Sequence, residues 1–205
     1  MSDWLDGVLG HGGPPEDIEG ELARAGFVSG VHATAAFGRL VELALDAFGP
    51  RSSMALDAVT WSGEGPGMRW YACRNRLAES PFYRWVLSAV DPAAAAEDVV
   101  AEPLPGGIFG LRAELAMLVV NEKLYTTNEP VIGGLGNEVD DVVSAWWREL
   151  TDGRPEDFLA HVVEDAWSPW FGAEDEYRFA GTWVALDRRL QRAYVVRVAL
   201  PVDDW

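Results

Sequence analysis

The sequence predicts a single α+β domain in which an antiparallel sheet, built from hairpins, has amphipathic helices packed on one face. Some segments carry apolar residues at helical spacing, whereas others are short β-compatible runs separated by turn residues. Successive hairpins pair their strands in antiparallel fashion, which is typical of α+β proteins. The chain shows no internal repeat at a fixed period, so solenoids and propellers are not expected.

The first 50 residues predict an arm followed by two helices. Residues 1–15 end in a stretch rich in Gly and Pro, so we expect a flexible N-terminal arm before a domain over residues 16–205. A short helix is expected from Glu16 to Ala25, with Gly26 as its stop. The second helix is predicted by the spacing of Phe37, Leu40, Val41, Ala44, Leu45 and Phe48.

The next segments predict a hairpin and a further helix. Residues 54–61 and 68–73 are β-compatible runs on either side of a glycine-rich turn. A helix is expected to begin at Ser80 and Pro81, because Ser is a favourable N-cap and Pro fits the first helical position. The loop over residues 102–110 is a candidate boundary between two subdomains.

Residues 111–120 are open to two interpretations. Alternate positions are apolar, which favours a strand, with residues 123–132 pairing back as a second strand. Helix is the alternative, because Leu, Ala, Glu and Met all have high helix propensity.

The last third of the chain predicts two helices and a hairpin. One helix follows Asn137, and a second begins at Pro155 and runs to Trp167. Residues 177–186 and 193–200 are expected to form a C-terminal hairpin. The apolar stripes of the two helices contain Val139, Val142, Val143, Trp146, Trp147 and Leu150, and then Phe158, Leu159, Val162, Val163 and Trp167.

The charge balance favours some partners and excludes others. Sixteen basic and 33 acidic residues give a net charge of −17. Nucleic acid and anionic membrane surfaces are therefore not expected partners, because binding either requires Lys and Arg. A basic protein, a cationic small molecule or a divalent cation would be attracted instead, and a basic protein is the partner that we favour. The basic residues are Arg except for Lys123, which is typical of a GC-rich genome and suggests a bacterial source.

Cysteine use and the N-terminus predict a cytoplasmic protein. Cys73 is the one cysteine, so no intramolecular disulfide can form. The first residues lack the basic and apolar regions of a signal peptide, and no apolar run is long enough to span a bilayer. The oligomeric state is left open.

His161 is the candidate catalytic or metal-binding residue. In the helix expected from Pro155, Asp157, Glu164 and Asp165 lie at i−4, i+3 and i+4 from it, on one face. A carboxylate there could orient His161 as a general base. The alternative is a surface histidine among acids, because this face lies opposite the apolar stripe.

No motif identifies an enzyme class. The sequence lacks a Gly-x-Ser-x-Gly elbow, a Walker A pattern and a dinucleotide fingerprint. Its acidic clusters, including Asp140 and Asp141, do not have the spacing of a calcium loop. We therefore expect no cofactor and no metal.

Aromatic and acidic residues meet in one predicted loop, which is the candidate partner-binding site. Aromatics beside acids suit an Arg- or Lys-rich partner, through ion pairs and cation–π contacts. The loop contains Trp170, Phe171, Glu174, Asp175 and Glu176.

Two functional hypotheses follow. The first, which we favour, is a non-enzymatic module of the immunity or inhibitor type that neutralises a basic partner. The second is a small-molecule enzyme or binding protein that has an aromatic-lined pocket and a site at His161. Ten tryptophans could supply either a core or such a pocket.

Overall fold

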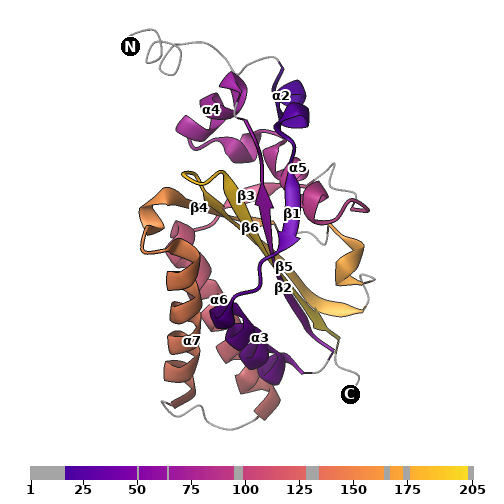
Figure 1. The fold of residues 1–205 in the computed structure, drawn as a ribbon. Helices are drawn as coiled ribbons and strands as arrows, with labels where there is room; N and C mark the ends of the chain where they lie inside the picture. Colours follow the sequence, from indigo (N-terminus) through magenta and orange to yellow (C-terminus); the bar gives the residue numbers. More distant parts are fainter. Residues whose placement is uncertain are drawn as a thin grey trace.

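The computed structural model of the chain describes residues 17–49, 51–63, 65–94, 99–127, 134–163, 167–172 and 176–202. It confirms the predicted α+β class, with helices packed against a six-stranded antiparallel sheet (Figure 1). The strands are β1 (Val28–Val31), β2 (Ser53–Thr60), β3 (Ala101–Pro103), β4 (Phe158–Val163), β5 (Tyr177–Asp187) and β6 (Arg192–Pro201).

The sheet has the strand order β1-β2-β6-β5-β4-β3, and every neighbouring pair is antiparallel. The two longest strands, β5 and β6, lie at its centre and form the predicted C-terminal hairpin, with Val184 opposite Val195. Both strands are nearly continuous apolar runs, because helices cover both faces of the sheet.

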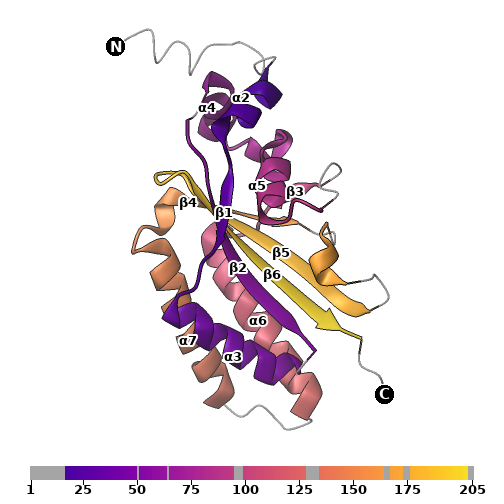
Figure 2. The same cartoon turned by 45° about the vertical axis from the view of Figure 1, so that its right-hand side comes forward.

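Helices form two groups on opposite faces. The helices α3 (Ala35–Phe48), α6 (Gly107–Thr127) and α7 (Gly134–Thr151) pack together at the lower end in Figure 1, whereas α2 (Ile18–Ala25), α4 (Pro66–Cys73) and α5 (Phe82–Val90) lie at the upper end. Figure 2 gives a second view of this separation. The second group adds a helical layer to the one that the sequence predicts.

Alternate residues of the central strands enter two separate cores. Trp183 and Ala185 of β5 pack with α3, α6 and α7, whereas Val184 and Leu186 pack with α2, α4 and α5. This is the period-two alternation of a strand that is buried on both faces. The largest fully buried side chains of the two cores include Trp146 in the first, and Phe82 and Tyr83 in the second.

The segment 111–120 belongs to helix α6, so the strand prediction was wrong and the alternative was right. Ile108, Leu111, Leu115 and Val119 are all buried, and they recur every three or four residues along one helical face. The segment 123–132, predicted as a paired strand, continues α6 as far as Thr127, and its last five residues lie outside the described part of the chain.

Residues 68–73 form helix α4, so the predicted hairpin with residues 54–61 was wrong. Pro66 occupies the first turn of the helix, where its missing N–H costs nothing. Glu21 of α2 accepts hydrogen bonds from the backbone N–H groups of Gly67 and Met68, at 3.0 and 3.1 Å. A carboxylate distant in the sequence therefore caps α4.

The helix predicted from Pro155 to Trp167 was also wrong. Pro155–Asp157 is a single 3-10 turn, η3, and Phe158–Val163 is strand β4, paired with β3 and β5. Its run of apolar residues satisfies helical spacing, but a strand buried on both faces has the same composition. Two further 3-10 turns are η1 (Leu77–Glu79) and η4 (Pro169–Phe171).

The predicted helices at Glu16 to Ala25 and around Phe37 to Phe48 correspond to α2 and α3. The predicted arm, residues 1–15, lies outside the described residues. Within the described ranges, no helix is both long enough and apolar enough to cross a membrane.

Candidate functional site

His161 lies in the middle of strand β4 and is buried, with 2% of its surface exposed. The predicted exposed helical face therefore does not exist. Asp157 lies in η3, four residues before His161. Because the chain between them is an extended strand, the two residues are separated by roughly 13 Å along the chain. The Asp157 carboxylate pairs with Arg154 at 2.8 Å. Glu164 and Asp165 lie outside the described residues.

The neighbour of His161 is a tyrosine. The hydroxyl group of Tyr83 lies 2.5 Å from Nδ1 of His161, and Nε2 has no hydrogen-bond partner among the described residues. Burial lowers the pKa of His161 to about 4 and raises the pKa of Tyr83. The imidazole is therefore neutral at neutral pH. No group of three or more His, Cys, Asp or Glu residues in the described ranges is placed to hold a metal ion.

The aromatic residues of the predicted partner-binding loop pack inward. Trp167 and Phe171 are buried, and the Trp167 indole donates to the Thr182 hydroxyl at 2.9 Å. Trp170 is half-buried and lies over the guanidinium of Arg197, 4.6 Å from the ring centroid. Glu174 and Asp175 lie outside the described residues, and the carbonyl group of Glu176 accepts a hydrogen bond from the Val202 N–H.

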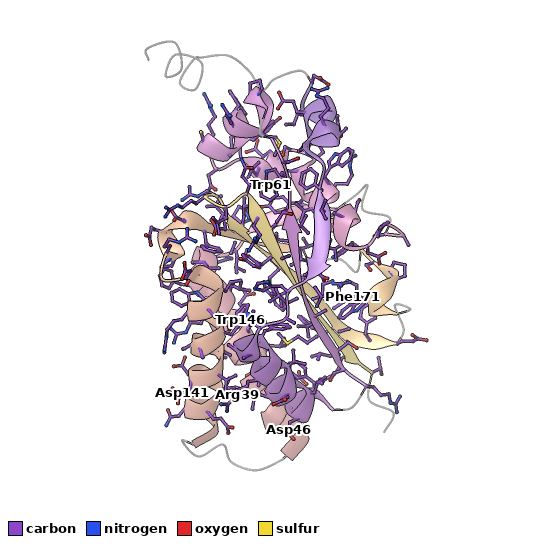
Figure 3. The ribbon with its side chains drawn as sticks, viewed as in Figure 1. Arg39, Asp46, Trp61, Asp141, Trp146 and Phe171 are labelled. Carbon is purple, nitrogen blue, oxygen red and sulfur yellow. The ribbon has the colours of Figure 1, made fainter. Side chains whose placement is uncertain are left out.

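A groove lies between helices α3 and α7, and its lining holds two acids and one arginine. Its volume is about 450 Å³. Figure 3 labels Arg39 of α3 and Asp141 of α7 at its two sides. Apolar side chains form part of the lining, and charged side chains complete it: Ala36, Arg39, Glu138, Asp141, Val142 and Ala145.

Packing beneath the groove fixes the two helices. Phe37 of α3 contacts Trp146 of α7, with ring centroids 6.4 Å apart, and both side chains are buried. The Thr34 hydroxyl caps α3 by accepting from the Phe37 N–H at 3.1 Å. Glu149 of α7 accepts from the Ala36 N–H at 3.3 Å, so a carboxylate joins the helices at the positive end of the α3 dipole.

The acids that line the groove form no ion pair with a described residue, although Arg39 lines the same groove. Among the described residues, Glu138 and Asp141 form no ion pair, and neither does exposed Glu42 of α3. Asp140 differs, because it pairs with Arg112 of α6 at 2.7 Å. The sequence shows the acidic pair at 140–141, but the position of α3 beside α7 depends on tertiary packing.

Comparison with known proteins assigns no family to the chain. No protein-family model matches the sequence, and no curated protein matches it. Among solved structures, this chain is similar to the crystal structure of citrus MAF1. The match covers 80% of this chain and 98% of the citrus MAF1 chain, with 11% sequence identity and a TM-score of 0.46.

Proposed function

We propose that this chain is a non-enzymatic protein-binding module that binds a basic partner protein through the groove between α3 and α7. Inhibition of that partner, as immunity proteins inhibit toxins, is the form of activity that we propose. The observation that carries the proposal is the pair of acids Glu138 and Asp141, which line the groove and form no ion pair among the described residues. Exposed Glu42 lies one helical turn after Arg39 on α3 and adds a third acid near this surface.

The groove has the chemistry to receive an arginine or lysine side chain. The aliphatic part of such a side chain can pack on Val142 and Ala145, while its charge meets Glu138 and Asp141. An Arg guanidinium can form two parallel hydrogen bonds to one carboxylate, which adds geometric specificity to the attraction.

Arg39 of α3, opposite Glu138 and Asp141 of α7, makes the two sides of the groove differ in charge. A partner cation that approaches Arg39 is repelled, so the favourable position for a cation is on the α7 side. An acidic group of the partner next to that cation could then meet Arg39.

The net charge of −17 supports the same proposal at longer range. Opposite net charges accelerate the encounter of two proteins, and this acceleration weakens as salt screens the charges. Such steering contributes to association rate and specificity more than to affinity.

A peptide of nine arginines is a simple probe of the groove. Titrated into isotopically labelled protein, it should shift the backbone amide resonances of residues 36–46 and 138–149 first. The triple variant Glu42→Lys, Glu138→Lys, Asp141→Lys should lose these shifts. If the peptide instead shifts signals across the whole surface, and the variant behaves like the original protein, the groove is not the binding site.

A further inference from the structure

A second cavity, of about 360 Å³, lies between α4, η1 and the turn that joins β5 to β6. Trp61, which contributes to this cavity, lies in the upper half of the molecule in Figure 3, whereas Arg39 and Asp141 of the α3–α7 groove lie in the lower half. The residues that line this second cavity are Trp61, Met68, Arg69, Ala72, Cys73, Leu77, Asp157, Leu186, Arg188 and Arg189.

The sign of the charge is reversed in this cavity. Three arginines line it, against one acid, in a chain whose net charge is −17. That acid is Asp157, and its carboxylate already pairs with Arg154 at 2.8 Å. Asp157 is therefore already engaged, and the lining holds no other acid that could pair with Arg188 or Arg189.

Two of the arginines come from the β5–β6 turn. Arg188 donates to the backbone carbonyls of Asp157 at 3.2 Å and Glu156 at 2.7 Å. Carbonyl groups orient its guanidinium without neutralising it. Among the described residues, the side chain of Arg189 makes no ion pair. Both side chains therefore keep their positive charge available to a ligand.

The turn itself is held in place by Asp187, which is 1% exposed. One oxygen of its carboxylate accepts from the N–H groups of Arg189 and Leu190, at 2.9 and 3.0 Å. The other oxygen accepts from Arg154 at 3.1 Å. These hydrogen bonds fix the backbone of the turn, and with it the positions from which Arg188 and Arg189 extend.

The rest of the lining is apolar and includes an unsatisfied donor. Met68, Leu77 and Leu186 are buried side chains of the second core. The indole N–H of Trp61 is buried and has no acceptor among the described residues, although buried donors are normally paired. An apolar cavity with a few convergent polar groups is the usual form of a small-molecule site.

We propose that this cavity binds a small organic anion whose apolar body packs on Trp61, Met68 and Leu186 and whose carboxylate or phosphate group lies beside Arg188 and Arg189. The guanidinium fork matches both kinds of anionic group. This site is separate from the α3–α7 groove and does not depend on the function proposed for that groove.

The fluorescent aromatic sulfonate 1-anilinonaphthalene-8-sulfonate tests the proposal, because it combines an apolar body with one anionic group. The wild-type chain should bind it at one saturable site. Arg189→Gln should weaken binding roughly 10-fold, the loss expected for one charge-assisted contact. The matched control Arg39→Gln, in the other groove, should leave the affinity unchanged. Equal affinity of Arg189→Gln and the wild-type chain would overturn the proposal.

Cys73 provides an independent way to locate the bound sulfonate, because it lines the cavity and is exposed. It is also the one cysteine of the chain, so its alkylation can be followed without interference. Saturating sulfonate should slow alkylation of Cys73 by neutral iodoacetamide, with half-protection near the dissociation constant. Benzoate or phenyl phosphate should compete with the sulfonate, whereas benzyl alcohol should not. Absence of protection, or equal competition by the alcohol, would contradict an anion site here.

Discussion

The Tyr83 hydroxyl of α5 and Nδ1 of His161 in β4 are 2.5 Å apart inside the second core, so a helix and a strand are joined by a buried polar pair. The two rings are also in contact, with centroids 4.7 Å apart. Because burial holds the imidazole in its neutral form, this pair links the stability of the fold to pH.

The first prediction concerns acid sensitivity. The pKa of His161 is about 4 in the folded chain, below its ordinary value of 6.5, so the unfolded chain binds the proton more readily. The stabilisation is fully present above pH 6.5 and is lost as the pH falls toward 4. Between pH 7 and pH 5 this one group should cost roughly 2 kcal/mol of unfolding free energy.

The variant Tyr83→Phe, His161→Leu removes both polar partners and isolates this effect from the titration of carboxylates. Urea unfolding at pH 7 and pH 5 measures it, and the wild-type chain should lose more stability than the double variant by that amount. Parallel losses in the two proteins would show that His161 is not held neutral by burial.

The second prediction concerns the buried ion pair of the sheet. Arg197 of β6 donates to Asp57 of β2 at 2.7 Å, and both residues are less than a tenth exposed. Asp57→Ala should destabilise the chain by about 3–5 kcal/mol, because it leaves the Arg197 charge buried and unpaired. Chemical denaturation measures the loss.

The double variant Asp57→Leu, Arg197→Met is the control for that interpretation. Removing both charges should restore most of the stability, since replacement of a buried pair by apolar residues is often neutral. If the double variant is as unstable as Asp57→Ala, the loss comes from packing, including the contact of Arg197 with Trp170, and not from an orphaned charge.

The third prediction concerns the cap of α4. Glu21→Ala should destabilise the chain by about 1–2 kcal/mol, because the N–H groups of Gly67 and Met68 lose their acceptor. Arg24→Ala on the same helix is the control, since Arg24 is exposed and its ion pair within the described part of the chain is a surface pair with Asp17. Equal thermal unfolding of the two variants would contradict a capping role for Glu21.

This cap also shows why part of the fold could not be predicted from the sequence. Residues 68–73 include Trp70 and Tyr71, which favour strands, and the acceptor that caps their helix is contributed by α2. In the same way, β4 was predicted as a helix, because a strand buried on both faces lacks the alternation that identifies a half-buried strand. Both errors arise where tertiary burial overrides local pattern.

The elements that were predicted correctly have local signals. Helix α3 has one apolar stripe and ends at Gly49, and the C-terminal hairpin consists of two apolar runs joined by a charged turn. The site was harder to predict. The acids at 138–141 are visible in the sequence, but their position beside Ala36 and Arg39 depends on the contact between Phe37 and Trp146.

The fourth prediction concerns Asp187. Asp187→Ala should destabilise the chain by about 2–4 kcal/mol and should also weaken sulfonate binding, because the turn that holds Arg188 and Arg189 loses its acceptor. Asp187→Asn keeps one oxygen for the two turn N–H groups, so it should retain more affinity than Asp187→Ala. Equal sulfonate affinity of the two variants would contradict a contribution of this turn to the anion site.

The function proposed here is tested most directly by a comparison of two charge reversals with equal change in net charge. One variant carries Glu42→Lys, Glu138→Lys and Asp141→Lys at the α3–α7 groove. The other carries Glu174→Lys, Asp175→Lys and Glu176→Lys, in the segment that the sequence predicted as the partner-binding loop. A basic protein captured by the wild-type chain and then purified serves as the ligand.

Association and dissociation rates are measured by surface plasmon resonance at low and high salt, with folding of each variant checked by circular dichroism. We predict that the groove variant loses binding by roughly 100-fold or more, with faster dissociation, because two or three charged contacts are reversed. The variant at 174–176 should lose only the part of the association rate that salt also removes. Equal losses in the two variants would contradict the groove as the binding site.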